Sequence, residues 1–204
     1  MKKLLCTVLL IGACLECVYA EAPQIICVGD SITYGDEKNG FPQELAKLVT
    51  GYVINEGRPS DTSWGIYSRA LQLVKLKPKY LIIQAGYNDR FYAWMPTNHY
   101  HLTRDEEDGY LLYGFRPITI ADYQDFIERI WNLCQRVGVK LILVTIATNP
   151  THPYEPRLKF YNDILNAYPG TVDIKLTIKH FSDAVHLSPE GYKEYAKQIY
   201  NNMK

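Results

Sequence analysis

The feature that most constrains the fold is a regular alternation of short apolar runs with longer amphipathic runs. Apolar segments at 24–28, 80–85 and 140–146 are typical of strands, and the intervening segments place apolar residues at helical spacing. Further short strands are expected at 52–54 and 172–174, and helices at 41–49, 62–76, 119–137, 156–167 and 189–201. Apolar strands separated by helices predict a parallel sheet covered on both faces. We therefore expect a single three-layer α/β/α domain with a mostly parallel, five-stranded sheet.

The first twenty residues differ from the rest of the chain in composition. Two lysines precede an apolar run at 4–15, and a small-residue site ends at Ala20. This order is typical of a secretory signal peptide, and the run is shorter than the ~20 residues that a membrane span needs. The alternatives are an N-terminal core helix and a lipoprotein site that leaves Cys14 lipidated. We expect a signal peptide at 1–20, a domain at 21–204 and a secreted or periplasmic location, with lipid anchoring as the alternative.

Charge and cysteine content exclude some classes of protein. The 204 residues include 22 lysines and arginines and 22 aspartates and glutamates, so the formal net charge is zero. No basic field points to nucleic acid or to an anionic membrane surface as a partner. Outside the leader only Cys27 and Cys134 remain. One lies in an apolar run and the other on an apolar helical stripe, which favours buried thiols over a disulfide or a metal pair.

Three short motifs lie beside the expected elements: Gly-Asp-Ser-Ile-Thr at 29–33, Gly-Tyr-Asn-Asp at 86–89 and Asp-Ala-Val-His at 183–186. Together they contain the groups that acyl transfer needs. Ser31 is a candidate nucleophile, His186 the base that takes its proton, and Asp183 the carboxylate that orients the imidazole. The backbone N–H of Ser31 and the side-chain amide of Asn88 suit an oxyanion hole. The Gly-x-Ser-x-Gly elbow of the α/β-hydrolases is absent from the sequence.

These motifs resemble the conserved blocks of the SGNH hydrolases, also called GDSL-type lipases and esterases. Residues 55–62 are similar to the family's remaining block, Asn-x-Gly-x-x-Gly-x-Thr, whose second glycine gives its N–H to the oxyanion hole. Ser60 stands at that glycine and keeps the N–H, and Gly57 is a less favoured substitute. The resemblance covers nearly the whole chain after the leader and looks closest to a secreted bacterial thioesterase/lysophospholipase subgroup. It implies a flavodoxin-like sheet and an oxyanion hole formed by Ser31, Ser60 and Asn88.

The stretch at 90–117 breaks the alternation of strands and helices. It is long, has no clean period and is rich in aromatic residues and histidine. Such loops in compact domains are usually functional, so we expect an insertion near the active site whose aromatic residues either line a pocket or pack onto the domain. Its possible metal ligands match no standard spacing, and we expect no metal and no cofactor. These residues are His99, His101, Asp105, Glu106 and Asp108.

The motifs and the resemblance together predict a serine hydrolase. It would cleave carboxylic esters or thioesters through an acyl-enzyme on Ser31, with a small-molecule, lipid or glycan ester as substrate and no stable membrane span. Two alternatives stay open. One is a carbohydrate O-acetylesterase within the same family. The other is a non-catalytic module that keeps the fold and binds glycans or lipids.

Overall fold

The fold is built around one parallel sheet. The computed structural model describes residues 24–36, 39–89, 118–151 and 155–203. The strands are β1 (Ile25–Gly29), β2 (Val53–Gly57), β3 (Tyr80–Gln84) and β4 (Lys140–Val144). They are parallel and follow the order β2-β1-β3-β4. The central strands β1 and β3 are buried along their whole length, because helices cover both faces of the sheet.

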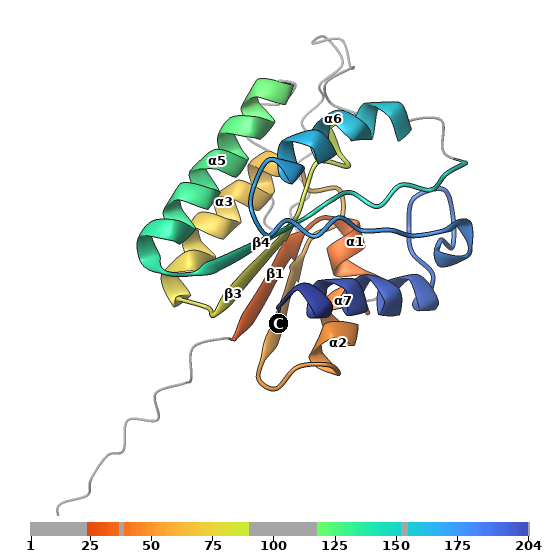
Figure 1. The fold of residues 1–204 in the computed structure, drawn as a ribbon, viewed down its shortest axis with the longest axis horizontal. Coiled ribbons are helices and arrows are strands. Elements are labelled where there is room, and N and C mark those ends of the chain that lie inside the picture. Colours follow the sequence, from red (N-terminus) through yellow and green to blue (C-terminus); the bar gives the residue numbers. More distant parts are fainter. Residues whose placement is uncertain (1–23, 37–38, 90–117, 152–154, 204) are drawn as a thin grey trace, which may run out of the picture.

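The helices form a layer on each side of the sheet (Figure 1). Their bounds are α1 (Ser31–Tyr34), α2 (Phe41–Ala46), α3 (Ser63–Leu73), α5 (Ile120–Val137), α6 (Glu155–Asn166) and α7 (Pro189–Met203), with 3₁₀ helices η1 (Val74–Leu76) and η3 (Ile178–His180). α3, α5 and α6 pack on one face, and α1, α2 and α7 pack on the other. This confirms the α/β fold class with helices on both sides of a parallel sheet.

The two faces of β1 feed two separate cores. Ile26 and Val28 pack with the α3, α5 and α6 layer, whereas Ile25 and Cys27 pack with the other layer. This follows from the period of two along a strand. Cys134 lies in the first core, on α5, so the two thiols are on opposite sides of the sheet. Both are free and buried, which confirms the prediction of buried thiols.

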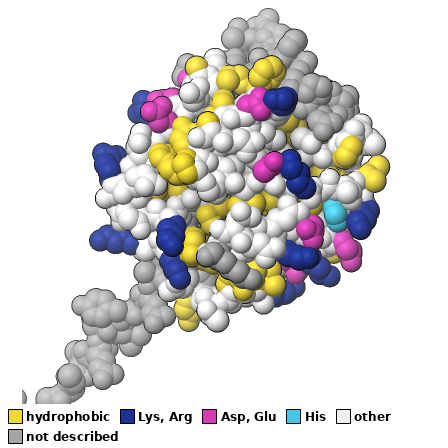
Figure 2. Space-filling model, viewed as in Figure 1, with side chains coloured by type: hydrophobic (Ala, Val, Ile, Leu, Met, Phe, Trp, Pro, Cys, Tyr) yellow, Lys and Arg dark blue, Asp and Glu magenta, His cyan; other side chains and the backbone are white. Residues whose placement is uncertain are grey.

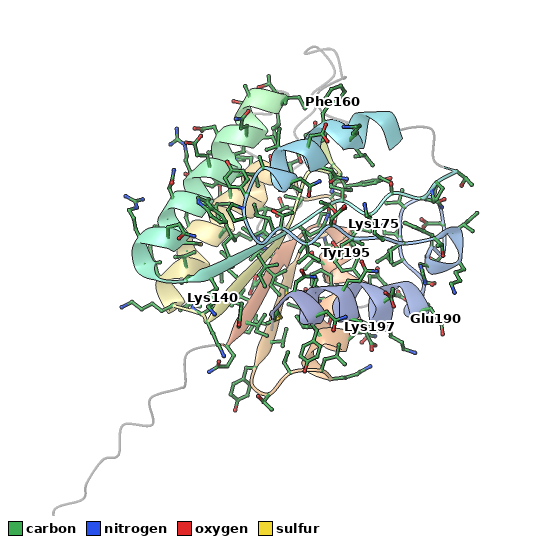
Figure 3. All side chains as sticks on the ribbon, in the orientation of Figure 1. Lys140, Phe160, Lys175, Glu190, Tyr195 and Lys197 are labelled. Atoms are coloured by element: carbon green, nitrogen blue, oxygen red, sulfur yellow. The ribbon has the colours of Figure 1, made fainter. Side chains whose placement is uncertain are left out.

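Helix α7 closes the second core with one side and meets solvent with the other. Tyr195 is fully buried, and its ring stacks on Phe41 of α2 with the centroids 4.8 Å apart. Figure 3 shows Tyr195 on the side of α7 toward the sheet and Lys197 on the side away from it. The face of the molecule in Figure 2 carries acidic and basic side chains interspersed along this helix.

The expected fifth strand at 172–174 is wrong, because only a single bridge forms there, between Val144 and Val172. Val172 makes two backbone hydrogen bonds beside β4, of 2.8 and 3.0 Å. The N–H of Ile174 then donates to the side-chain Oγ1 of Thr145 at 2.8 Å. This hydroxyl takes the place of the backbone carbonyl that would continue the ladder. The sheet of the described residues therefore has four strands.

The second strand is longer than predicted. We expected it at 52–54, but β2 runs through three further residues, and its pairing with β1 continues to Gly29 opposite Gly57. Its polar residues Asn55 and Glu56 are half-buried at the edge of the sheet. An edge strand tolerates such side chains because the backbone ladder forms regardless of them.

Two predictions concern parts of the chain outside the described residues. The signal peptide at 1–20 and the aromatic insertion at 90–117, with its histidines and acidic residues, both lie there, so they and the domain limits stay predictions. None of the helices that the structure describes is long and apolar enough to span a membrane.

Candidate active site

The first motif places Ser31 at the carboxyl end of a central strand. β1 ends at Gly29, and Ser31 is the first residue of α1. Asp30 stands between them, and its Oδ1 accepts the N–H of Ile32 at 2.9 Å, which caps the helix. The resulting strand-to-helix turn buries Asp30 but leaves Ser31 partly exposed. Ligands of parallel α/β sheets bind at this edge.

The last motif brings a histidine to this serine from 155 positions further along the sequence. His186 Nε2 lies 3.2 Å from Ser31 Oγ. His186 Nδ1 lies 2.8 Å from Asp183 Oδ2. The three side chains expected to act together therefore form one hydrogen-bonded line. In this geometry an imidazole can take a hydroxyl proton while the carboxylate fixes its orientation.

The loop around Asp183 holds its carboxylate in the ionised form. Oδ1 accepts the backbone N–H groups of Val185 and His186, both at 2.6 Å. Partial desolvation raises the pKa of Asp183, but these N–H groups and the imidazole outweigh it and hold the pKa below its ordinary value. The main-chain carbonyl of Asp183 also accepts a side-chain N–H of the buried Asn149 at 3.2 Å. Asn149 belongs to no motif, and the sequence analysis missed it.

The middle motif places Asn88 just beyond the end of β3. Its Nδ2 donates to the carbonyl oxygen of Asp61 at 2.9 Å. A carboxamide carries two N–H bonds, so this contact orients the group and leaves the second bond for a ligand. Asp61 directly follows Ser60. The two residues predicted as donors from separate motifs are therefore connected through one residue, Asp61.

Ser60 adopts the left-handed backbone conformation, with φ 64°. It follows Pro59 in a turn that the N–H of Asp61 closes by donating to the carbonyl of Arg58 at 3.2 Å. A positive φ at this position usually requires glycine, so the serine adopts a conformation that glycine favours, at a cost of about 1 kcal/mol. Gly57, the less favoured donor, already gives its N–H to a side-chain oxygen of its own strand at 2.9 Å.

Two further carboxylates, Asp30 and Asp89, lie in the core beneath these residues. Asp30 Oδ2 accepts the amide of Gln84 at 3.1 Å, and Gln84 Oε1 accepts the hydroxyl of Thr33 at 3.2 Å. Asp89 accepts both the backbone N–H, at 3.0 Å, and the hydroxyl of Ser63 at the start of α3. Burial raises the pKa of Asp30 to about 7 and that of Asp89 to about 6, although their hydrogen bonds act in the opposite direction.

The described ranges contain no group of three or more His, Cys, Asp and Glu side chains that could hold a metal ion. The residues brought together at the site are instead a hydroxyl, an imidazole, a carboxylate and amide donors. This set fits chemistry in which a proton moves between Ser31 and His186.

Comparison with protein families places the chain in a known class. The model of the GDSL-like Lipase/Acylhydrolase family matches residues 27–194, which is most of the chain. The protein belongs to this family and is an ester hydrolase. A search of curated proteins found no match.

Solved structures share the fold at low sequence identity. A GDSL-like lipase from Bacteroides thetaiotaomicron is 19% identical with a TM-score of 0.62, over 88% of each chain. The acetylxylan esterase Axe2 from Geobacillus stearothermophilus is 17% identical with a TM-score of 0.64, over 89% of this chain and 94% of its own. A member of the lipolytic G-D-S-L family from Veillonella parvula is 16% identical with a TM-score of 0.63, over 87% and 96%.

Proposed function

We propose that the protein hydrolyses carboxylic esters through an acyl-enzyme on Ser31. The observation that carries this proposal is the line of hydrogen bonds from Ser31 Oγ to His186 at 3.2 Å and on to Asp183 at 2.8 Å. A serine hydroxyl is a weak nucleophile unless a base within hydrogen-bond reach takes its proton. A third group must orient that base, and Asp183 is in contact with the far nitrogen of the imidazole.

In the first half-reaction, His186 Nε2 accepts the proton of Ser31 Oγ as the oxygen attacks the ester carbonyl carbon. The imidazolium is stabilised by Asp183, which stays ionised. The tetrahedral intermediate then collapses, the bond to the leaving alcohol breaks, and His186 returns the proton to that alcohol. In the second half-reaction, His186 takes a proton from water, the resulting nucleophile attacks the acyl-enzyme, and the acid leaves as Ser31 regains its proton.

Negative charge on the carbonyl oxygen needs donors that are already in place. We assign this role to the backbone N–H groups of Ser31 and Ser60 and to the side-chain amide of Asn88. The left-handed turn at Ser60 and the bond from Asn88 to Asp61 support the assignment, since both fix the direction of a donor before substrate arrives.

Two substrate classes fit this chemistry. One is an ester or thioester of a longer acyl chain, and the other is an O-acetyl ester of a carbohydrate. The second class is the alternative that the sequence leaves open, and an acetylxylan esterase shares the fold. A pocket for a long chain and a pocket for an acetyl group differ in the apolar area they bury, so a series of acyl lengths separates the two classes.

The test is hydrolysis of p-nitrophenyl acetate, butyrate and octanoate by the wild type and by Ser31→Ala. We expect the variant to lose at least 1,000-fold in kcat, because the nucleophile is removed while the fold is kept. Ser68→Ala is the matched control, since that hydroxyl donates to the carbonyl of Trp64 in the same helix, at 2.9 Å. Equal turnover by wild type and Ser31→Ala would overturn the assignment of the nucleophile. No turnover by either, with glycan or lipid binding retained, would favour a binding module.

A further inference from the structure

Arg69 reaches from α3 to the carboxyl ends of two strands. Its guanidinium donates to the carbonyl of Glu56 in β2 and, at 3.2 Å, to the carbonyl of Gly29 in β1. It also pairs with the carboxylate of Asp61, with Nε 3.2 Å from Oδ2 and Nη2 on the same oxygen. The side chains of Arg69 and Asp61 are only 12% and 16% exposed. The pair is therefore largely removed from water. It differs in this from exposed ion pairs, which contribute little to stability.

Asp61 is attached through its backbone and its side chain at once. Its N–H donates to Arg58 at 3.2 Å, and its carbonyl accepts from Asn88 at 2.9 Å. Its Oδ1 accepts the N–H of Thr62 at 3.0 Å, while Oδ2 holds Arg69. A residue fixed in this way transmits the position of the guanidinium to the turn before it and to the amide that contacts it.

Both of the donors proposed outside α1 depend on Asp61. Ser60 precedes it in the chain, and Asn88 donates to its carbonyl. The left-handed conformation of Ser60 is unfavourable for a residue with a Cβ atom, so it persists only where the surrounding contacts impose it. Arg69 supplies such contacts, and it also touches Gly29, two residues before Ser31. One side chain thus ties the strand of the nucleophile to the loop of the other donors.

The geometry points to Arg69 as a positioning residue that sets the Ser60 N–H and the Asn88 amide against Ser31, through Asp61. This inference rests on the proposed function. Arginine suits the task because its planar fork carries five N–H donors in fixed directions, so it can serve acceptors on three segments together. A lysine at this position supplies the charge but has no such fork.

The consequence for kinetics follows from when the donors act. They stabilise charge that exists only in the transition state, so displacing them lowers kcat and leaves KM nearly unchanged. Loss of one donor outright costs about 100- to 1,000-fold in rate. We expect Arg69→Lys to lower kcat about 10- to 100-fold, with KM within about threefold, since the donors are displaced rather than removed.

The experiment measures kcat and KM on p-nitrophenyl acetate for wild type, Arg69→Lys and Arg69→Ala. The same proteins are titrated with phenylboronic acid, whose tetrahedral adduct on a serine oxygen imitates the transition state. We expect the affinity for the boronic acid to fall in parallel with kcat. Asp61→Asn, which keeps an oxygen for Thr62 but loses the charge, should lower kcat about tenfold and provides the test if Arg69→Ala does not fold.

Arg129→Ala is the matched control, because Arg129 pairs with Asp125 at 2.8 Å on an exposed part of α5. It should keep kcat and KM within twofold of the wild type. The inference is overturned if folded Arg69→Lys or Asp61→Asn retains wild-type kcat, if the loss is in KM alone, or if kcat falls while boronic acid affinity does not. Ser31→Ala tests the proposed function separately, since turnover that survives it would remove the acyl-enzyme whatever the Arg69 variants do.

Discussion

Asp183 and Asp30 carry the same carboxyl group in opposite surroundings near Ser31. Asp183 lies on an exposed loop, where its oxygens accept two N–H groups and an imidazole, and its pKa is held below the ordinary value. Asp30 directly precedes Ser31 but is buried, and its pKa is raised to about 7. The first carboxylate can stabilise a neighbouring positive charge at neutral pH, and the second is only partly ionised there.

Under the proposed mechanism, the difference separates a carboxylate that takes part in the reaction from one that holds the structure of the site in place. Desolvation disfavours the charged form, so a partner of the catalytic base is best placed where donors and solvent keep it ionised. The buried Asp30 and Asp89 instead receive backbone N–H groups at the starts of α1 and α3. They hold the ends of two helices, a role that a neutral acid can still fill through its carbonyl oxygen.

Asp183→Asn tests the exposed carboxylate, and we expect it to lower kcat more than any other change discussed below. An amide keeps an oxygen for the N–H groups of Val185 and His186, so the loop stays in place. It removes the charge that stabilises the imidazolium, and it turns an N–H group toward His186 Nδ1, which favours the tautomer that carries its proton on Nε2. We expect kcat to fall about 1,000- to 10,000-fold, as for other triads that lose this charge. The control is Asp163→Asn, which removes an exposed partner of Lys159 on α6 and should leave kcat unchanged. Wild-type turnover by Asp183→Asn would contradict the role given to Asp183.

The pH dependence of the rate tests the same region. His186 acts as a base only when its imidazole is neutral, so kcat/KM should rise across pH 5 to 8, by about tenfold per unit at the acidic end. The lowered pKa of Asp183 keeps that carboxylate ionised over the whole range, so it adds no second inflection. The measurement is initial rates on p-nitrophenyl acetate, corrected for spontaneous hydrolysis. A rate that is constant from pH 5 to 8 would exclude His186 as the base.

Asp30→Asn tests the buried carboxylate through the pH dependence of the free energy of unfolding. Because the pKa of Asp30 is raised from 3.8 to about 7 on folding, the native state binds more protons than the unfolded state between these values. The free energy of unfolding therefore falls as pH rises from about 4 to 7. Asparagine does not titrate and can still accept the N–H of Ile32, provided that Gln84 turns its amide over toward Thr33.

We expect Asp30→Asn and the wild type to have similar stability near pH 4 and the variant to gain about 2 to 4 kcal/mol relative to the wild type by pH 7.5. Urea denaturation at four pH values measures this difference. Asp163→Asn, on the exposed face of α6, should run parallel to the wild type. Parallel curves for Asp30→Asn would show that the buried carboxylate does not titrate in this range. An acidic inflection that stays unchanged in the rate profile of Asp30→Asn would show that Asp30 is not its source.

The same contrast explains what could be predicted from the sequence. That Ser31, Asp183 and His186 lie together could be predicted because each stands in a short motif beside an apolar run, and parallel strands gather such motifs at one edge of the sheet. The contacts of Asn149 and Arg69 could not be predicted because they include hydrogen bonds to main-chain carbonyl groups, which any sequence provides. Nothing local distinguishes such a side chain from one that faces solvent.

Two other features depended on tertiary contacts that local patterns do not encode. The left-handed φ of Ser60 is not one that serine prefers, and the next residue, Asp61, is held by contacts with Asn88 and Arg69 that lie far away in the sequence or on the following helix. The fifth strand was lost because the hydroxyl of Thr145 accepts an N–H that a backbone carbonyl would otherwise take. Threonine is a good strand residue by propensity. That propensity gives no indication of which N–H group the hydroxyl will accept, so the bond to Ile174 could not be predicted.

Asn149→Ala should give the smallest effect and shows how far the Asp183 loop supports itself. Asn149 donates to the carbonyl of Asp183 at 3.2 Å and accepts the N–H and hydroxyl of Thr151 at 3.1 and 2.9 Å. Its loss leaves both N–H groups that hold the Asp183 carboxylate in place, so we expect kcat/KM to fall only about three- to tenfold and stability by about 1 kcal/mol. Asn202→Ala is the matched control, since Asn202 donates to a carbonyl of its own helix at 2.9 Å on the surface.

A loss in kcat/KM as large as that of Asp183→Asn would mean that the Asp183 loop depends on Asn149 for its position. Unchanged kinetics would mean that the N–H groups of residues 185 and 186 are sufficient to hold the carboxylate against the imidazole.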